Sequence, residues 1–119
     1  MPAAPLPPDD ASAPLVVLTT LANEEQAVAL VRALLDRRLV ACGTLLPGAR
    51  SLYRWQGEVT DEREVVVLLK TVRARLVALE AVFAELHPYT VPELLALPVA
   101  NGLAPYVNWL TAETRVGDA

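Results

Sequence analysis

The segment LVACGTLLPGARSLYRWQGEVTDEREVVVLLKT, residues 39–71, decides the fold because it predicts two long strands joined by one turn. The Gln-Gly pair at 56–57 is typical of a tight hairpin turn. The Pro-Gly pair at 47–48 predicts a bend or bulge, since proline lacks a ladder donor and glycine accepts a positive φ. Residues 65–69 are uninterruptedly apolar, which is typical of a central strand buried on both faces.

The residues before this hairpin predict a strand and an amphipathic helix. Residues 14–20 form a short β-branched run. Asn23 is a natural N-cap, and Gln26 three residues later completes a capping-box pattern. Helical spacing then places four apolar residues on one face: Ala27, Val31, Leu34 and Leu35.

The residues after the hairpin predict a second helix, a last strand and a final short helix. The second helix has an apolar stripe made by Val72, Leu76, Leu79, Phe83 and Leu86. Pro88 disfavours helical backbone at His87, so this helix should end near Leu86. Residues 93–99 predict the last strand, and Pro105 suits the first position of the final helix.

The predicted order is therefore β-α-β-β-α-β plus a C-terminal helix. This is the split βαβ, ferredoxin-like arrangement of an α+β protein, with an antiparallel sheet and its helices on one face. The other face is left uncovered, and 54% of the 119 residues are apolar. We expect the sheet of another subunit to cover this second face, with a homo-oligomer as the result.

Composition limits the domain organisation and the partners. We expect one folded domain at residues 14–115, a disordered N-terminal tail at 1–13 rich in Pro, Ala and Asp, and a short tail at 116–119. The net charge of −4 argues against a nucleic-acid partner. We expect no membrane association, because no apolar run reaches the length of a membrane span. A single cysteine, Cys42, suits the reducing cytoplasm.

The candidate functional residues give little support to catalysis. His87 is the single histidine, and the sequence offers it no nearby nucleophile or orienting group. It is either part of a rigid helix-to-strand corner set by the two flanking prolines, or a ligand or metal contact. No enzyme motif is present, so we expect a binding or regulatory protein rather than an enzyme.

Two further features could contribute to a ligand cleft. Tyr53 and Trp55 lie two residues apart on a strand and therefore on one face, where they either pack in an interface or form an aromatic wall. Lys70 ends an apolar run, a costly position unless the ammonium is solvated or paired. Its candidate partners are Glu64 and Glu93, and the alternative is an anion-binding role.

Three motifs in this order closely resemble the CutA, or divalent-cation-tolerance, proteins: VACGTLLPGARSLYRWQGEV, EVVVLLKT and HPYTVPELLALPV. The resemblance runs from about Leu15 to Thr111. It implies a ferredoxin-like subunit assembled as a tight cytoplasmic homotrimer, with a role in tolerance of divalent metals and no established enzymatic activity. It also implies a groove between subunits, for which we expect Tyr53, Trp55, Glu64, Lys70, His87, Tyr89 and Glu93 as lining residues.

The metal ligands that the resemblance implies are only partly present. Family members use a cysteine at the end of the first strand and a His-His pair before Pro-Tyr. Here these positions hold Thr19 and Leu86-His87, so His87 alone remains as a candidate ligand. We therefore expect no required cofactor and weak binding of Cu or Zn. The alternative is a signalling module built like the P-II proteins, which binds a small anionic metabolite and a target protein.

Overall fold

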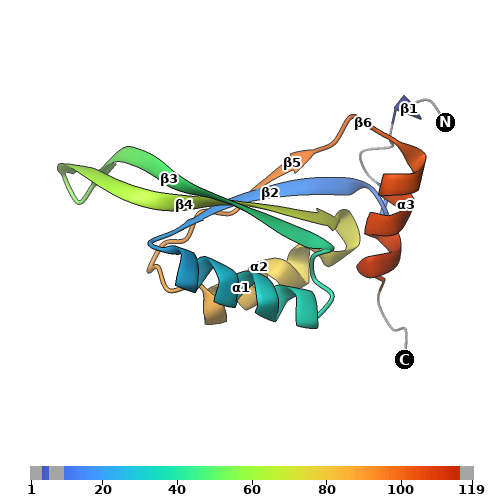
Figure 1. Ribbon diagram of the computed structural model, residues 1–119, viewed down its shortest axis with the longest axis horizontal. Helices are drawn as coiled ribbons and strands as arrows, with labels where there is room; N and C mark the ends of the chain where they lie inside the picture. The colour runs from blue at the N-terminus through green and yellow to red at the C-terminus, as the bar shows by residue number, and fades with distance from the viewer. Residues whose placement is uncertain (1–3, 6–9, 116–119) are drawn as a thin grey trace.

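A four-stranded antiparallel sheet dominates the computed structural model, which describes residues 4–5 and 10–115 (Figure 1). The strand order is β3-β4-β2-β5. The strands of this sheet are β2 (Pro14–Leu21), β3 (Cys42–Trp55), β4 (Glu58–Val72) and β5 (Leu95–Pro98). The described residues also form three α-helices, α1 (Glu24–Asp36), α2 (Leu76–Leu86) and α3 (Ala104–Glu113), and a 3-10 turn at Arg73–Arg75. The structure is therefore of the predicted α+β class.

The β3–β4 hairpin is the longest feature and confirms the prediction made for residues 39–71. Its turn has positive φ at both Gln56 (50°) and Gly57 (81°), as a two-residue hairpin turn requires. The register shifts between Leu46 and Ala49, which places a bulge at the predicted Pro-Gly pair. The far half of the hairpin extends beyond the helices into solvent (Figure 1).

The core lies between the sheet and the helices α1 and α2, which cover one face together (Figure 1). Asn23 caps α1 as predicted, because its Oδ1 accepts a hydrogen bond from Gln26 N at 2.8 Å. The α2 helix ends at Leu86, also as predicted. Of the residues expected on the buried faces of these helices, Leu35 and Leu86 are exceptions, with 40% and 36% of their surfaces exposed. Val72 belongs to β4 rather than to α2.

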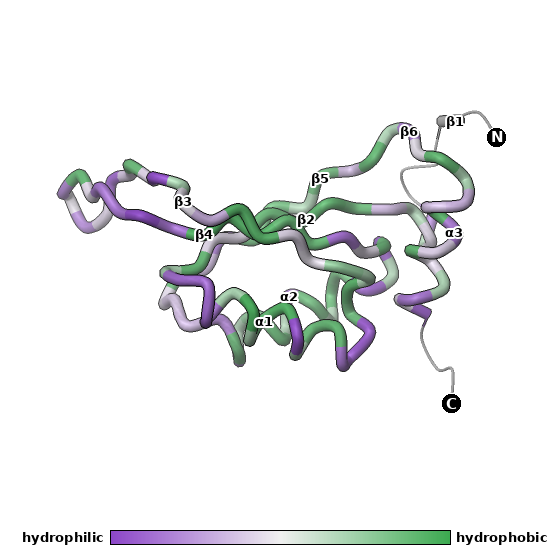
Figure 2. The backbone as a smooth tube through the Cα atoms, in the orientation of Figure 1, coloured by the Kyte–Doolittle hydropathy of each residue, from purple (hydrophilic) through white to green (hydrophobic). Residues whose placement is uncertain are grey.

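The opposite face of the sheet is not covered within the chain. In β4, Val65, Val67 and Leu69 are buried, whereas the alternating Val66 and Leu68 stay partly exposed. The single chain therefore buries residues 65–69 on one face, because both long helices pack on one side. Burial of the other face by a second subunit stays a prediction. Figure 2 shows hydrophobic residues along the central strands and hydrophilic ones along the outer half of β4.

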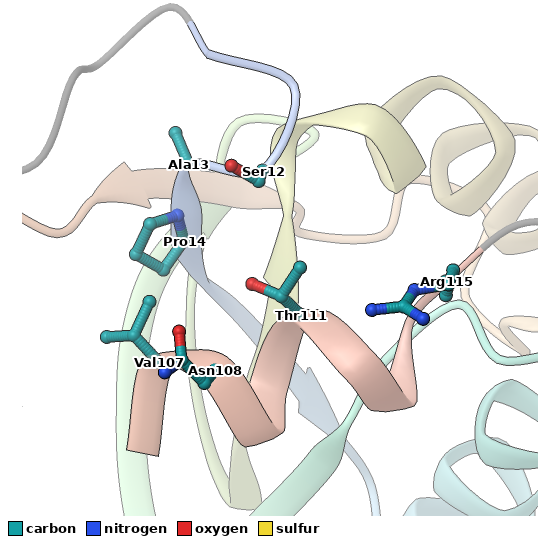
Figure 3. A pocket seen from close by; sticks show the side chains of 7 residues that line it. All are labelled: Ser12, Ala13, Pro14, Val107, Asn108, Thr111 and Arg115. Atoms are coloured by element: carbon teal, nitrogen blue, oxygen red, sulfur yellow. The ribbon is translucent and has the colours of Figure 1, made fainter. Parts of the chain in front are cut away.

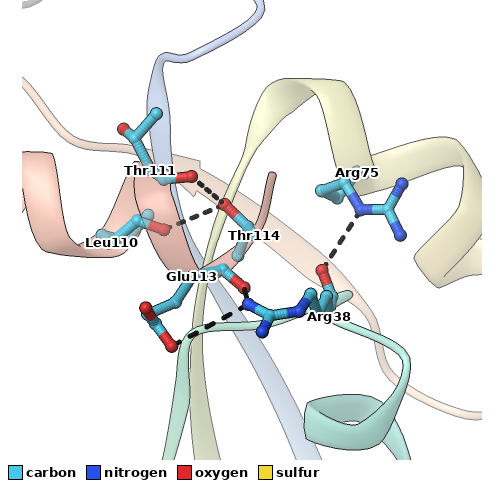
Figure 4. Close-up of polar contacts among 6 residues, drawn as sticks. All are labelled: Arg38, Arg75, Leu110, Thr111, Glu113 and Thr114. Carbon is cyan, nitrogen blue, oxygen red and sulfur yellow. Dashed lines mark hydrogen bonds and ion pairs between the residues drawn. The ribbon is translucent and has the colours of Figure 1, made fainter. Parts of the chain in front are cut away.

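The C-terminal helix α3 packs at one end of the sheet. Leu110 forms a small second core with Ala41 and Val72. Arg38 fastens the end of α3, where its Nη1 donates to Glu113 O at 3.3 Å and lies 3.9 Å from Glu113 Oε1 (Figure 4). The hydroxyl of Thr114 donates to the carbonyl of Leu110 at 2.9 Å (Figure 4). The Arg38 contacts hold α3 against the segment that joins α1 to β3, and the Thr114 bond closes the last turn of α3.

The residues just before β2 pack on the domain. The carbonyls of Ala11 and Ala13 accept hydrogen bonds from the amides of Ala74 and Arg73, both at 2.9 Å, and Ala13 is buried. Two residues nearer the start form a short strand β1 (Ala4–Pro5), which pairs with β6 (Asn101–Gly102). The rest of the predicted N-terminal tail, residues 1–3 and 6–9, and the C-terminal tail at 116–119 lie outside the described residues.

Candidate groove between the hairpin and the 87–94 loop

A surface groove lies where the hairpin leaves the rest of the sheet. Its volume is about 720 Å³, and it is open to solvent. One wall comes from β3 and β4, and the other from the loop between α2 and β5. The lining residues are Thr20, Arg50, Ser51, Leu52, Tyr53, Trp55, Thr60, Glu62, Glu64, Tyr89, Thr90, Val91 and Glu93.

The hairpin wall presents aromatic rings and carboxylates on one side. Tyr53 pairs with Thr60 across the hairpin, and Ser51 pairs with Glu62, so all four side chains share a face. The hydroxyl of Tyr53 donates to Glu62 Oε2 at 3.0 Å. Partial desolvation, together with this hydrogen bond, raises the pKa of Tyr53, so its hydroxyl remains a donor at neutral pH.

The floor of the groove is a carboxylate linked to the loop wall. Glu64 has only 6% of its surface exposed, and its Oε2 accepts a 2.6 Å hydrogen bond from the hydroxyl of Tyr89. Burial and then this carboxylate raise the pKa of Tyr89, which keeps its hydroxyl protonated. The Glu64–Tyr89 bond therefore ties β4 to the loop and fixes the width of the groove.

His87 supports the loop wall from behind and does not line the groove. Its Nδ1 accepts from the amide of Tyr89 at 3.2 Å, so the proton is on Nε2. Nε2 lies 3.0 Å from Thr20 O and 3.1 Å from Thr19 Oγ1. The ring also packs against Phe83, with centroids 5.5 Å apart. Desolvation is the main reason why the pKa of His87 lies below its ordinary value, so the neutral ring acts as a buried connector.

The structure brings together most of the residues predicted to line a groove. Tyr53, Trp55, Glu64, Tyr89 and Glu93 all line it, and His87 lies directly behind Tyr89. Lys70 does not line it.

The ammonium of Lys70 lies near the other end of β4, 3.4 Å from Thr44 Oγ1. Among the described residues, neither Glu64 nor Glu93 forms an ion pair with it. Lys70 therefore has no part in the groove of this chain.

Sequence reasoning missed two charged residues of the groove, Arg50 and Glu62. Strand alternation could have found Glu62, because it precedes Glu64 by two residues on the same strand and therefore shares its face. Arg50 had no such signal, because strand alternation places its side chain on the face of β3 opposite to Tyr53. It forms a bidentate pair with Asp61, with N···O distances of 2.8 and 2.6 Å.

The two metal positions implied by the resemblance do lie together, since Thr19 contacts His87 through its hydroxyl. A hydroxyl is a poor ligand for soft metals. Both nitrogens of His87 are already engaged in hydrogen bonds within the protein. In the described part of the chain, no group of three or more His, Cys, Asp or Glu side chains is placed to hold a metal ion.

A second, smaller pocket of about 320 Å³ lies between α3 and the start of β2 (Figure 3). Its side chains are Ser12, Ala13, Pro14, Val107, Asn108, Thr111 and Arg115. Arg115 is the one charged residue in that set, and Figure 3 shows its guanidinium beside Thr111. The pocket shares no residue with the groove, and none of the predicted site residues lies in it.

The fold and the groove define a small α+β protein with an open antiparallel sheet and a polar, aromatic surface groove. A family model described as CutA1 divalent ion tolerance protein matches residues 15–113. The chain therefore belongs to the CutA1 family, as the sequence motifs predicted.

Curated relatives and solved structures agree with this assignment. The divalent-cation tolerance protein CutA of Thermus thermophilus is 46% identical over 99 residues, which cover 83% of this chain and 96% of that protein. The Escherichia coli protein of the same name is 44% identical over 104 residues, covering 87% and 93% of the two chains. The structure of CutA from Synechococcus elongatus superposes with a TM-score of 0.86 at 31% identity and covers 96% of each chain. The Thermus thermophilus structure superposes with a TM-score of 0.83 at 44% identity, covering 86% of this chain and 99% of that one.

Proposed function

We propose that this protein acts in tolerance of divalent cations as a binding protein, with the groove of Tyr53, Glu64 and Tyr89 as its ligand site. The observation that carries the proposal is the family match across residues 15–113, which contains every one of these groove residues. Curated relatives at about 45% identity bear the name divalent-cation tolerance protein. These names favour this function over the alternative of a P-II-like signalling module.

The functional unit in this proposal is a homotrimer of ferredoxin-like subunits. The element order and the strand order β3-β4-β2-β5 support the ferredoxin-like description. The uncovered face supports the assembly, because Leu46, Leu95 and Leu97 expose 48%, 57% and 46% of their surfaces on it. A second sheet packed there removes this apolar surface from water.

Metal binding in this proposal is weak and exchangeable. His87 is the candidate ligand, but a metal ion has to displace either the Tyr89 amide from Nδ1 or Thr20 O and the Thr19 hydroxyl from Nε2. Stable transition-metal sites normally use three or four converging ligands. We therefore propose that His87 serves mainly to hold the loop wall, and that tolerance does not depend on a metal bound tightly by one subunit.

We also propose that the protein is cytoplasmic, not enzymatic, and without a nucleic-acid or membrane partner. The family takes its name from ion tolerance and not from a reaction. The net charge of −4 disfavours contact with phosphate backbones. Among the described residues, no helix has the length and apolar character needed to cross a bilayer.

The function can be tested in a bacterial strain that lacks its own family member. Strains expressing the parent chain, the Glu64→Gln variant or an empty vector are grown across a copper series. We expect the parent chain to raise the copper concentration that halves growth, and Glu64→Gln to reduce that gain. Equal growth with the parent chain and the vector contradicts the proposed role in tolerance.

Light scattering of the purified protein tests the assembly separately. We expect about three times the chain mass of 12.8 kDa. The matched variant is Leu68→Glu, which places a charge in the middle of the uncovered face and should dissociate the trimer into folded monomers. A parent protein that stays monomeric at micromolar concentration contradicts the assembly.

A further inference from the structure

The groove carries an excess of negatively charged side chains. Glu62, Glu64 and Glu93 line it, against a single cation, Arg50. The guanidinium of Arg50 is already paired with Asp61 through two hydrogen bonds of 2.8 and 2.6 Å. In the hairpin register Arg50 alternates with Ser51, so its side chain leaves β3 on the side opposite to Glu62. The carboxylates of the groove therefore lack a compensating cation among the described residues.

The charge imbalance is energetically unfavourable chiefly at Glu64, because this carboxylate is buried. The residue has only 6% of its surface exposed and lines the groove, where its described contact is the hydroxyl of Tyr89 on Oε2. A hydroxyl donates one hydrogen bond but brings no positive charge. A carboxylate held away from water is unfavourable unless a cation accompanies it. The second oxygen of Glu64 is therefore the natural contact for a positively charged group that enters the groove.

The aromatic walls suit a cation that also has an apolar part. Trp55 and Tyr53 are 43% and 39% exposed, although large aromatic side chains are normally well buried. The two rings lie on the same side of β3 as the carboxylates. The faces of Trp and Tyr rings attract ammonium and guanidinium groups. Carboxylates beside exposed rings are the combination that recognises an organic cation.

A metal ion and an anion fit this groove less well. The carboxylates do not converge closely enough for a metal, since no cluster of three or more potential ligands occurs within residues 10–115. The small anionic metabolite considered from the sequence would meet three carboxylates, with the one cation already paired. A volume of about 720 Å³ is also far larger than a bare ion needs and lies in the range of small-molecule sites.

We propose that the groove binds a small organic cation. Its ammonium or guanidinium group meets Glu64, and its methylene chain packs on Tyr53 and Trp55. This inference rests on the proposed function, because it gives the chemical class of the ligand for that same groove. It makes recognition depend on Glu64 and Trp55 rather than on His87, which lies behind the wall.

Calorimetric titration with agmatine tests this proposal, because agmatine carries a guanidinium and an ammonium joined by four methylenes. The parent protein, Glu64→Gln, Trp55→Leu and the control Glu80→Gln are compared at constant ionic strength. Glu80 is an exposed carboxylate of α2 outside the groove, so the control loses the same charge. Gln at 64 can still accept the Tyr89 hydrogen bond, which preserves the wall.

We expect agmatine to bind the parent and the Glu80→Gln variant alike. Binding should weaken about tenfold to hundredfold in Glu64→Gln and about threefold to tenfold in Trp55→Leu. Glu62→Gln provides a second test on an exposed residue should Glu64→Gln fold poorly. Equal agmatine affinity in all variants overturns the proposal.

Citrate serves as the anionic comparison in the same experiment. If citrate binds in the groove and agmatine does not, the ligand class is wrong while the groove remains a ligand site. If neither compound binds the parent protein, both the ligand class and the proposed ligand site are overturned.

Discussion

The two faces of the sheet are built from the same strands, yet the chain closes only one of them. Val17, Val67 and Leu69 on the helix-covered face have no exposed surface, whereas Leu95 and Leu97 on the other face are about half exposed. Both faces are apolar, so strand alternation alone does not distinguish them. The difference comes from the helices, since α1 and α2 both pack on the same side. An apolar face without helices is therefore a surface available to another molecule.

The largest expected effect on stability comes from removing a buried side chain from the helix-covered face. Leu69→Ala should lower the free energy of unfolding by about 2–5 kcal/mol, because it removes a fully buried side chain and leaves a cavity. Leu97→Ala on the opposite face is the matched control. Both changes are made in the Leu68→Glu background, where no second sheet covers Leu97, and there Leu97→Ala should cost about half as much or less. Urea unfolding of both variants measures the difference. Equal losses would break the comparison, because Leu97 would then be packed as tightly as Leu69 within one chain.

An intermediate effect on stability is expected where α1 packs against Gly43 on the covered face. A Cβ atom at Gly43 would lie 2.8 Å from both Cγ atoms of Val31 and 3.2 Å from Leu69 Cδ2. Gly43→Ala should therefore cost about 1–3 kcal/mol of stability through overpacking. The double variant Gly43→Ala/Val31→Ala should cost less than the sum of the two single variants, since the second change makes room for the first. Strictly additive losses would show that the contact is not the cause.

Local sequence signals predicted most of the fold. The Gln-Gly turn, the Pro-Gly bulge, the Asn23 cap and the end of α2 each depend on backbone chemistry within a few residues, and each is found where expected. Burial of residues 65–69 on the second face stays a prediction, because burial depends on which elements pack against a strand. Burial also depends on such packing for Leu35, whose helical position was right although 40% of its surface is exposed.

The candidate site was predictable where residues are close in sequence or where the family motifs include them. Tyr53 and Trp55 share a face by alternation, and the loop residues Tyr89 and Glu93 follow from the motif after His87. The Glu64–Tyr89 hydrogen bond joins residues 25 positions apart, which periodicity cannot reveal. Lys70 shares a strand face with Glu64, but it lies six positions further along β4, too far along the strand to reach the groove.

The smallest expected effect on stability concerns His87. Its ring packs on Phe83 and contacts Thr19 on the covered side, and its Nδ1 accepts from the amide of Tyr89 in the groove wall. Desolvation places its pKa in the folded protein below the ordinary value of 6.5, although the Thr20 carbonyl and Glu64 oppose this. The unfolded chain then binds the proton more readily than the folded protein. The stability that depends on a neutral His87 is therefore fully present above pH 6.5. It is lost as the pH falls from 6.5 through the lower pKa of His87 in the folded protein.

His87→Gln tests this linkage, because its amide can still donate to Thr20 O but does not titrate. Between pH 7.5 and pH 5.5, we expect the melting temperature of the parent to fall further than that of the variant. Carboxylates titrate in both proteins, so the difference between the two losses isolates the imidazole. The same titration, followed through Trp55 fluorescence with both proteins in a Trp109→Phe background, should show the groove loosening in the protein that retains His87 at the lower pH, because a protonated Nδ1 can no longer accept from the Tyr89 amide. Equal losses in both proteins would mean that His87 is protonated in the fold without strain, and that the Tyr89 wall is held by Glu64 alone.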